Sequence, residues 1–373
     1  MRHSPKPLAI PVGVSPGPEK GSVHEIQNTG MRVCGQVADA VEGESGLLTP
    51  LTEVGSSPLP TPEEERDFVL RREEAQQAAR KEFQAFRSNP EVWVERYYSS
   101  PLIRGRNILS LDWILENAEC TKKYPGMGPR MGMLDGVRRL GEELGQMIQE
   151  HAQKRLDAIP TADRGDWFVD IVIGTPGGGK TTRADLMADQ PFSACVIEDV
   201  GGDYGRIARL VQRYKRMGFQ VEVHAPFLGL EESVARATGR TPRNNRPMPA
   251  DVLGGHFADT VTALRELVAR NEMDELGFGL RIGDSDGTYH KVTCLSELER
   301  FHPSLSRDGD RSTTIDVAHE LTSRTIGHIL ESGGEFPLDL LRFYAQSAGG
   351  HRTANSYWGI WRDANRAGAS QPG

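Results

Sequence analysis

The segment from Gly174 to Thr181 limits what this chain can fold into more than any other part of the sequence. It reads Gly-Thr-Pro-Gly-Gly-Gly-Lys-Thr and matches the P-loop pattern GxxxxGK[ST] at every fixed position. A short apolar, β-branched run, 168–173, comes directly before it, and residues 181–187 after it suit a helix. Strand, glycine-rich loop and helix in this order are what a phosphate-binding turn requires, so the segment predicts an α/β fold.

Each residue type in this loop has a physical reason to bind a nucleotide. Glycines let the backbone curl so that successive N–H groups face phosphate oxygens, and the helix that follows adds positive potential there. We expect Lys180 to reach the β- and γ-phosphates of ATP and the Thr181 hydroxyl to bind Mg²⁺, with Thr182 as a neighbouring alternative. The predicted nucleotide-binding residues are Gly174, Thr175, Pro176, Gly177, Gly178, Gly179, Lys180, Thr181 and Thr182.

Alternating strand and helix patterns continue beyond the loop. Apolar runs at 194–197, 219–223 and 278–282 predict strands, and apolar residues at helical spacing between 207 and 214 predict a helix between two of them. Such alternation indicates right-handed βαβ units and a parallel sheet. The chain upstream differs, because periodic apolar residues predict a helix from a Thr61–Glu64 capping box and a second one over about 133–157.

These patterns divide the chain into four regions. We predict a disordered segment at 1–60, a helical region at 61–165, a P-loop core at 166–300 and a C-terminal helical region at 301–373. Nine of the 23 prolines fall within the first 62 residues, and no helical or strand period persists there. A segment of this kind buries too little apolar surface to offset its ordering entropy. It is either a flexible tail or an unfolded export signal.

Composition excludes several classes of function. The formal net charge is −8, which argues against general nucleic-acid binding and against an anionic membrane surface as partners. No run of 18 apolar residues exists, so a transmembrane helix is not expected, and the N-terminus lacks the apolar stretch of a secretory signal peptide. The four cysteines are far apart, which predicts reduced thiols rather than disulfides or a zinc site: Cys34, Cys120, Cys195 and Cys294.

A P-loop alone does not separate kinases from ATPases and GTPases, so the acidic residues after the next strand matter. That strand ends in Glu198-Asp199, and Asp203 follows. Ligands of doubly wound sheets bind at the carboxyl ends of the strands, which places these acids where they can touch metal or accept a proton. Asp199 and Asp203 are the candidate catalytic acids, although Asp203 suits an N-cap equally well. Glu198 should point to the face opposite Asp199.

Two arginines further along suggest a phosphate clamp. Arg236 and Arg240 are four residues apart and would share one helical face, and a basic loop with Arg243 and Arg246 follows them. Mobile guanidinium groups can neutralise a phosphoryl group during transfer. The alternative is that both simply solvate the surface.

Together these segments resemble the zeta-toxin family of P-loop kinases. The likeness spans about Trp167 to Val292 and rests on the GTPGGGKTT loop, the strand with an acidic end, the Met-Gly-Phe that closes the next helix, and SVARATGR. The resemblance implies an α/β, P-loop kinase-like parallel sheet with flanking helices, here with additional N- and C-terminal helices. It also implies an ATP- and Mg²⁺-dependent kinase that phosphorylates a sugar hydroxyl.

Within the family, some members phosphorylate UDP-N-acetylglucosamine as toxins of toxin–antitoxin pairs, and a type III effector relative phosphorylates NAD on its adenosine ribose. The long polar N-terminal segment and the helical region before the P-loop look closer to the effector group. The resemblance therefore implies a bacterial toxin or effector that acts on NAD. It would be cytoplasmic in the producing cell, secreted by a type III system, and partnered by an antitoxin or chaperone protein.

One departure from the family concerns the general base. Typical members carry an aspartate after a strand about one full helix beyond the P-loop, but only 19 residues separate Lys180 from Asp199 here. The stretch 107–112, upstream of the P-loop, resembles a strand ending in an acid, Asp112, which could supply the missing group. The base therefore stays open among Asp199, Asp203 and Asp112. Alternatives to the NAD kinase are a UDP-N-acetylglucosamine kinase, an NTPase and a non-catalytic nucleotide-binding effector.

Overall fold

The computed structural model describes residues 60–127, 134–244, 247–273, 276–283, 287–301, 310–349, 351 and 353–369. The chain divides into two units, Met1–Leu48 and Thr49–Gly373, and all described residues belong to the second. The disordered segment predicted for 1–60 therefore lies, apart from Pro60, outside the described residues and stays a prediction. Within the described part of the chain, no helix is both long and apolar enough to cross a membrane.

One six-stranded sheet forms the centre of the described unit, in the order β1-β3-β2-β4-β5-β6. The first five strands in this order run parallel, and β6 runs antiparallel to β5 at one edge. The fold class is therefore α/β with a parallel sheet, as the sequence predicts, while the antiparallel edge strand was not predicted. The bounds are β1 Ile108–Leu109, β2 Phe168–Ile173, β3 Ser193–Asp199, β4 Gln220–Pro226, β5 Gly279–Gly283 and β6 Tyr289–Lys291.

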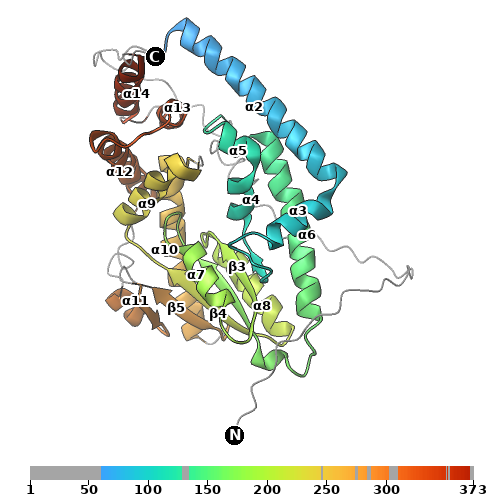
Figure 1. Cartoon of the computed structure of the whole chain (residues 1–373). Helices are drawn as coiled ribbons and strands as arrows, with labels where there is room; N and C mark the ends of the chain where they lie inside the picture. The colour runs from blue at the N-terminus through green and yellow to red at the C-terminus, as the bar shows by residue number, and fades with distance from the viewer. Residues whose placement is uncertain are drawn as a thin grey trace. The chain divides into compact units, whose positions relative to one another are not determined.

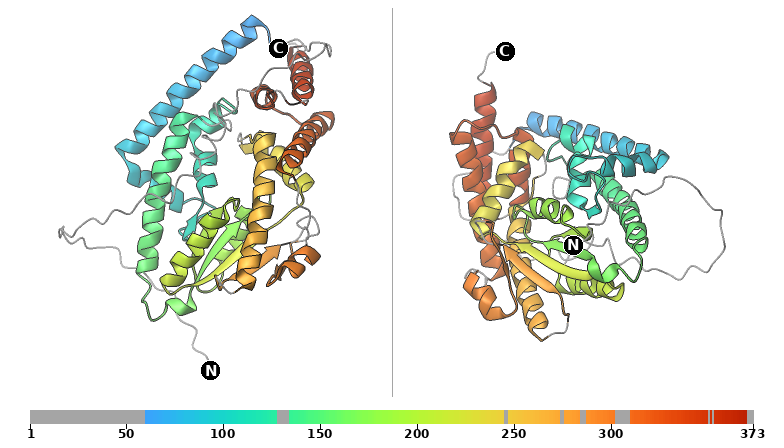
Figure 2. Two further views of the ribbon diagram at one scale, coloured as in Figure 1. Left: turned by 180° about the vertical axis from the view of Figure 1, so that it is seen from behind. Right: turned by 60° about the horizontal axis from the view of Figure 1, so that its bottom comes forward.

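Helices cover both faces of this sheet, as Figures 1 and 2 show. Alternation along β2 explains the two layers, because successive side chains of a strand point to opposite faces. Ile171 packs into a core with α8 (Tyr204–Arg216) and α10 (Ala250–Glu272). Val172 packs into a second core with α6 (Asp135–Asp157) and α7 (Lys180–Ala188). The P-loop helix α7 thus lies on one face, and α8 and α10 lie on the other.

The region before the P-loop is mostly helical but also supplies a strand. Its first helix, α2 (Pro62–Ser88), begins as predicted: the Thr61 hydroxyl accepts from the Glu64 N–H, and the Glu64 carboxylate accepts from the Thr61 N–H. After α3 (Pro90–Tyr98), the chain enters the sheet as β1, then forms α4 (Leu111–Asn117) and α5 (Glu119–Lys123). The stretch predicted at 107–112 is therefore a strand beside β3, although it ends at Leu109 and Asp112 lies in α4.

The helices after the core form two further clusters. Helix α9 (Leu230–Asn244) packs on α12 (Arg311–Glu331), which also lies along α10. Helices α13 (Leu338–Ser347) and α14 (Ala354–Ala369) pack together, and α11 (Leu295–Phe301) lies against α10. Helix α13 also contacts α2 near the start of the described chain, where Arg342, almost fully buried, pairs with Glu65 at 2.6 Å.

Candidate functional site: a P-loop between two acids and a histidine helix

The P-loop connects β2 to α7, in the strand–loop–helix arrangement that its sequence predicts. Gly177 and Gly179 have left-handed φ values of +82° and +92°. A side chain on Gly177 would place its Cβ 2.4 Å from the carbonyl oxygen of Ser233 on α9, so only glycine fits there. Helix α9 therefore lies directly against the loop. Of the nine predicted nucleotide-binding residues, 174–179 form the loop at the carboxyl edge of the sheet and 180–182 begin α7.

Lys180 is the first residue of α7 and is buried, with 9% of its surface exposed. Its Nζ donates hydrogen bonds to the carbonyl oxygens of Gly174, at 2.9 Å, and Thr175, at 3.2 Å. The ammonium group is therefore held against the first two residues of its own loop. The Thr175 hydroxyl, also buried, lies 2.9 Å from the Ser233 hydroxyl, which ties the loop a second time to α9. This geometry suits a cation that contacts phosphate oxygens bound in the loop.

Glu198, near the end of β3, faces the start of α7. It accepts a hydrogen bond from the Ser110 hydroxyl through Oε2, and Thr181 lies close enough to bond to the same carboxylate. The other oxygen, Oε1, is buried without a well-formed hydrogen bond to any described residue. A carboxylate oxygen and a threonine hydroxyl are ligands that Mg²⁺ prefers. This incompletely satisfied oxygen beside Thr181 therefore fits a divalent cation bridged to phosphate.

A second acid, Asp112, contributes to the electrostatics around Glu198. Burial raises the pKa of Glu198 most strongly, hydrogen bonding to Ser110 lowers it, and the nearby Asp112 raises it again. Asp112 also raises the pKa of His256 of α10, so it lies near both groups. Two carboxylates, Glu198 from β3 and Asp112 from α4, thus lie near the P-loop, with Lys180 close to both Glu198 and His256.

The structure places the two acids predicted as catalytic against α8. Asp199, on the face of β3 opposite Glu198, accepts from the Gly201 N–H at 3.0 Å and pairs with Arg206 at 2.8 Å. Asp203 is the N-cap of α8 and accepts from the Arg206 N–H at 3.0 Å. Both side chains therefore hold the loop and helix after β3. These positions favour Glu198 over Asp199 and Asp203 as the acid beside the phosphates.

The two predicted clamp arginines lie on α9, the helix that covers the loop. Arg236 is exposed and pairs with Glu232 one turn earlier. Arg240 is half-buried and close enough to Tyr344 of α13 to lower the pKa of its phenol slightly against the dominant, raising effect of burial. Arg243 is exposed, and Arg246 lies outside the described residues. The arginines therefore share the helix expected for them, and their role in phosphate binding stays a prediction.

Helix α10 brings side chains to the site that sequence reasoning did not assign. Burial lowers the pKa of His256, and the neighbouring cations Lys180 and Arg311 lower it further, against Asp259 and Asp112. Arg311, at the start of α12, pairs with Asp259 at 3.2 Å. The Thr260 hydroxyl donates to the carbonyl oxygen of Val200 at 3.3 Å, which fixes α10 beside the end of β3. Lys180 and Arg311 thus both lie near the His256 imidazole.

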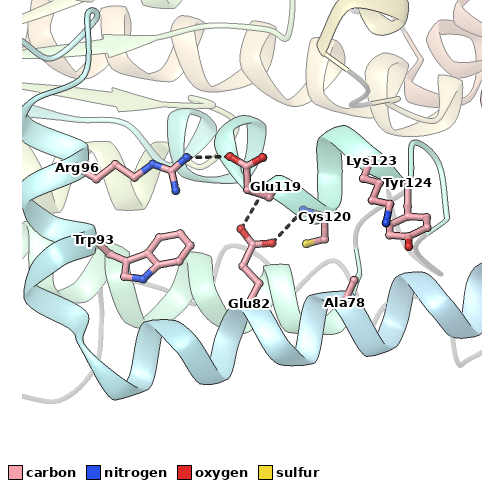
Figure 3. Close-up of a pocket in the computed structure, with 8 residues that line it drawn as sticks. All are labelled: Ala78, Glu82, Trp93, Arg96, Glu119, Cys120, Lys123 and Tyr124. Atoms are coloured by element: carbon pink, nitrogen blue, oxygen red, sulfur yellow. Dashed lines mark hydrogen bonds and ion pairs between the residues drawn. The ribbon is translucent and has the colours of Figure 1, made fainter.

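A separate cavity of about 330 Å³ lies among α2, α3 and α5, away from these residues (Figure 3). Its polar groups bond to one another: the Glu82 carboxylate accepts from the backbone N–H groups of Glu119, at 2.7 Å, and Cys120, at 2.9 Å, and Arg96 pairs with Glu119. This pocket is therefore built by the capping of α5. Its lining residues are Ala78, Glu82, Trp93, Arg96, Glu119, Cys120, Lys123 and Tyr124.

No protein-family model matches this chain, and no curated protein matches it. Among solved structures, it is similar to three crystal structures of AvrRxo1-ORF1:AvrRxo1-ORF2: one with sulphate ions, one native complex and one with ATP. Each is 14% identical, with TM-scores of 0.33, 0.31 and 0.33. The matches cover 65%, 62% and 62% of this chain and 91%, 89% and 94% of those chains. A likeness of this size assigns neither a family nor an activity.

Proposed function

We propose that this protein is an ATP- and Mg²⁺-dependent kinase that transfers a phosphoryl group to a sugar hydroxyl of a nucleotide-type metabolite. The observation that carries the proposal is the meeting of three groups at one strand-to-helix turn: the buried Lys180, the Thr181 hydroxyl and the incompletely bonded Glu198 carboxylate. The first binds phosphate and the other two suit a hydrated divalent cation.

In this proposal the loop N–H groups and Lys180 bind the β- and γ-phosphates, and Thr181 and Glu198 hold Mg²⁺. When bound, the ion neutralises charge on the phosphate oxygens. Burial raises the pKa of Glu198 despite the lowering effects of Ser110 and Lys180, and a bound cation would favour its ionised form. The P-loop also packs closely against α9, where Gly177 lies beside the backbone of Ser233.

The acceptor hydroxyl needs a proton acceptor, and the electrostatic effect of Asp112 on both Glu198 and His256 makes it our candidate. Of the three aspartates considered from sequence, Asp112 is the one that raises the pKa of both Glu198 and His256. Asp199 and Asp203 instead bond to residues at the start of α8. A base must lie within reach of the proton that it removes, either directly or through one water. We therefore assign the proton-accepting role to Asp112 and the role of holding Mg²⁺ to Glu198.

The acceptor itself comes from the resemblance to zeta-toxin-like kinases rather than from the site. NAD, phosphorylated on its adenosine ribose, is the first substrate to test, and UDP-N-acetylglucosamine is the second. The roles of a toxin or effector, a type III secretion route and an antitoxin or chaperone partner rest on the same resemblance. Affinity purification of the full chain from the cells that produce it, with mass spectrometry of the proteins that co-purify, would test for the partner.

The function is tested by incubating the full chain with ATP, Mg²⁺ and each acceptor, and measuring a product one phosphate heavier by mass spectrometry. We expect product with wild type and none with Lys180→Ala or Asp112→Asn. Asp199→Asn is the matched control, since it also neutralises an aspartate near the end of a strand, and it should retain product formation at reduced stability. Phosphate release without any phosphorylated acceptor, from these substrates or from a metabolite extract, would instead identify an NTPase.

A further inference from the structure

Helix α7, whose first residues form the phosphate site, is fixed on both flanks by arginines. On one flank Arg106 donates to the carbonyl oxygen of Asp185 at 3.1 Å and pairs with Asp189 at 2.7 Å, near the end of the helix. On the other flank Arg183, within one turn of Lys180, donates through Nη2 to Nδ1 of His224 at 2.9 Å. Its guanidinium also lies 3.7 Å from the centre of the Tyr289 ring. The two contacts join the P-loop helix to β4 and β6.

The bond from Arg183 determines the state of His224. A guanidinium has no acceptor, so Nδ1 must accept and cannot carry a proton. Nε2 then carries the hydrogen and donates to Asp170 Oδ1 at 2.9 Å. His224 is 1% exposed and Asp170 is 5% exposed, so neither bond can be replaced by water without opening the sheet face. The observed contact therefore requires a neutral His224.

Among the described residues, two further charged groups, Glu222 and Arg281, belong to this network. Glu222 Oε2 lies 3.5 Å from Nε2, and Arg281 bonds to Glu222 at 3.0 and 3.3 Å. The Tyr289 ring lies 6.4 Å from the imidazole. The ligand atoms of Asp170, Glu222 and His224 lie within 4.8 Å of one another, a spacing that suits a metal ion. Guanidinium groups already bond to His224 and Glu222, however, so the cluster is complete without one.

We propose that Arg183 is a positioning residue for nucleotide binding, which holds the start of α7 in its phosphate-binding orientation only while His224 is neutral. Protonation of His224 would set an imidazolium against a guanidinium, break the 2.9 Å bond and release that end of the helix. Nucleotide affinity should therefore fall as His224 becomes protonated. The inference rests on the proposed nucleotide-binding function of the loop.

The test measures the dissociation constant of Mg-ATP by calorimetry between pH 5 and 8. It compares four forms of the full chain: wild type, Arg183→Met, His224→Asn and Arg106→Met. We expect Arg183→Met to weaken binding about tenfold at pH 8, as for loss of one hydrogen bond from a charged donor. His224→Asn keeps an acceptor near the position of Nδ1, so it should bind like wild type at pH 8 and lose less affinity at pH 5. The titration of ATP itself is common to all four forms and cancels from their comparison.

Arg106→Met is the matched control, because it frees the other end of α7 without touching His224. It should lower thermal stability and leave the wild-type pH profile of ATP binding. The inference is overturned if Arg183→Met binds ATP as wild type does. If Arg183→Met does not fold, an unchanged pH profile for His224→Asn overturns it instead. Retention of ATP binding by Lys180→Ala would refute the nucleotide site itself, which is a different outcome.

Discussion

Among single residues, Gly177 is where the loop and its covering helix meet most closely. An added Cβ would lie 2.4 Å from the Ser233 carbonyl oxygen and 3.0 Å from the Ala237 amide nitrogen, and the φ of +82° is unfavourable for any other residue. We expect Gly177→Ala to displace α9 and weaken ATP binding at least tenfold, as measured by calorimetry. Gly239→Ala is the control, since Gly239 lies on α9 with open space at its Cβ position. Equal affinities for the two variants would contradict the close contact.

A substitution at Asp203 tests whether this acid, in the loop between β3 and α8, serves to cap α8 or to catalyse phosphoryl transfer. As the N-cap of α8 it accepts one backbone hydrogen bond, so Asp203→Ala should cost about 1 kcal/mol of unfolding free energy. ATP binding and phosphoryl transfer should stay within twofold of wild type. Urea denaturation and the transfer assay measure the two effects. Loss of transfer with unchanged stability would support the catalytic role that the sequence allows for Asp203.

The loop residues could be predicted from sequence because their pattern is local, and each glycine and Lys180 lies where the motif requires. The acids could not be ranked in the same way. Strand periodicity places Glu198 and Asp199 on opposite faces of β3, but which face carries the P-loop helix depends on packing across the whole sheet. Asp112 is 68 residues before Lys180 in sequence, so only the pairing of β1 with β3 brings it to the site.

At the scale of elements, α10 and α12 pack closely against each other at Gly254. A Cβ on Gly254 would lie 2.7 Å from the Ile315 Cα, which is backbone and cannot turn aside. We expect Gly254→Ala to force the helices apart and to cost about 1–3 kcal/mol of unfolding free energy. Gly327→Ala, on α12 with open space around it, should be neutral or stabilising by up to about 1 kcal/mol. Denaturant titrations of both variants measure the difference, and a stable Gly254→Ala would show that the contact is not tight.

Elements with a strong local signal were predicted within a few residues, including α2, α6, β2 and α8. Helix α10 was missed, although Leu253, Phe257, Val261, Leu264 and Val268 follow a helical period and are buried. Because this helix was not predicted, His256 and Asp259 were not assigned to the site either. Strand β6 has only three residues, so its pairing with β5 depends on tertiary contacts that no short pattern encodes.

For the molecule as a whole, the residues around the P-loop come from both sides of the domain boundary predicted at residue 165. The region before it supplies β1 to the sheet, Ser110 to Glu198 and Arg106 to the P-loop helix. Helix α2 also reaches the C-terminal helices, where Arg71 pairs with Asp339 at 2.8 Å and Arg342 lies 4.0 Å from the Phe68 ring. The region before residue 165 thus contacts both the P-loop helix and the C-terminal helices, which composition and local periodicity do not reveal.

A buried histidine in the C-terminal helices makes the stability of the whole molecule depend on pH. His319 is 4% exposed, and its ring stacks on His351 at 4.1 Å, with the His351 Nε2 bonded to Asp316 at 3.1 Å. Burial, and secondarily His351, lowers the pKa of His319 to about 4. An unfolded histidine has a pKa of about 6.5, so between these values the unfolded chain binds more protons than the folded one.

Folding stability should therefore fall as the pH drops from about 6.5 towards 4. We expect His319→Asn to reduce the loss of unfolding free energy between pH 7.5 and pH 5.0 by about 1–2 kcal/mol relative to wild type, as measured by urea denaturation at both values. Other groups that titrate in this range contribute equally to both proteins, so the difference isolates His319. His328→Asn, which removes an exposed histidine from the same helix, should leave the loss unchanged. Parallel pH profiles for wild type and His319→Asn would show that His319 is protonated as easily in the folded chain as in the unfolded one.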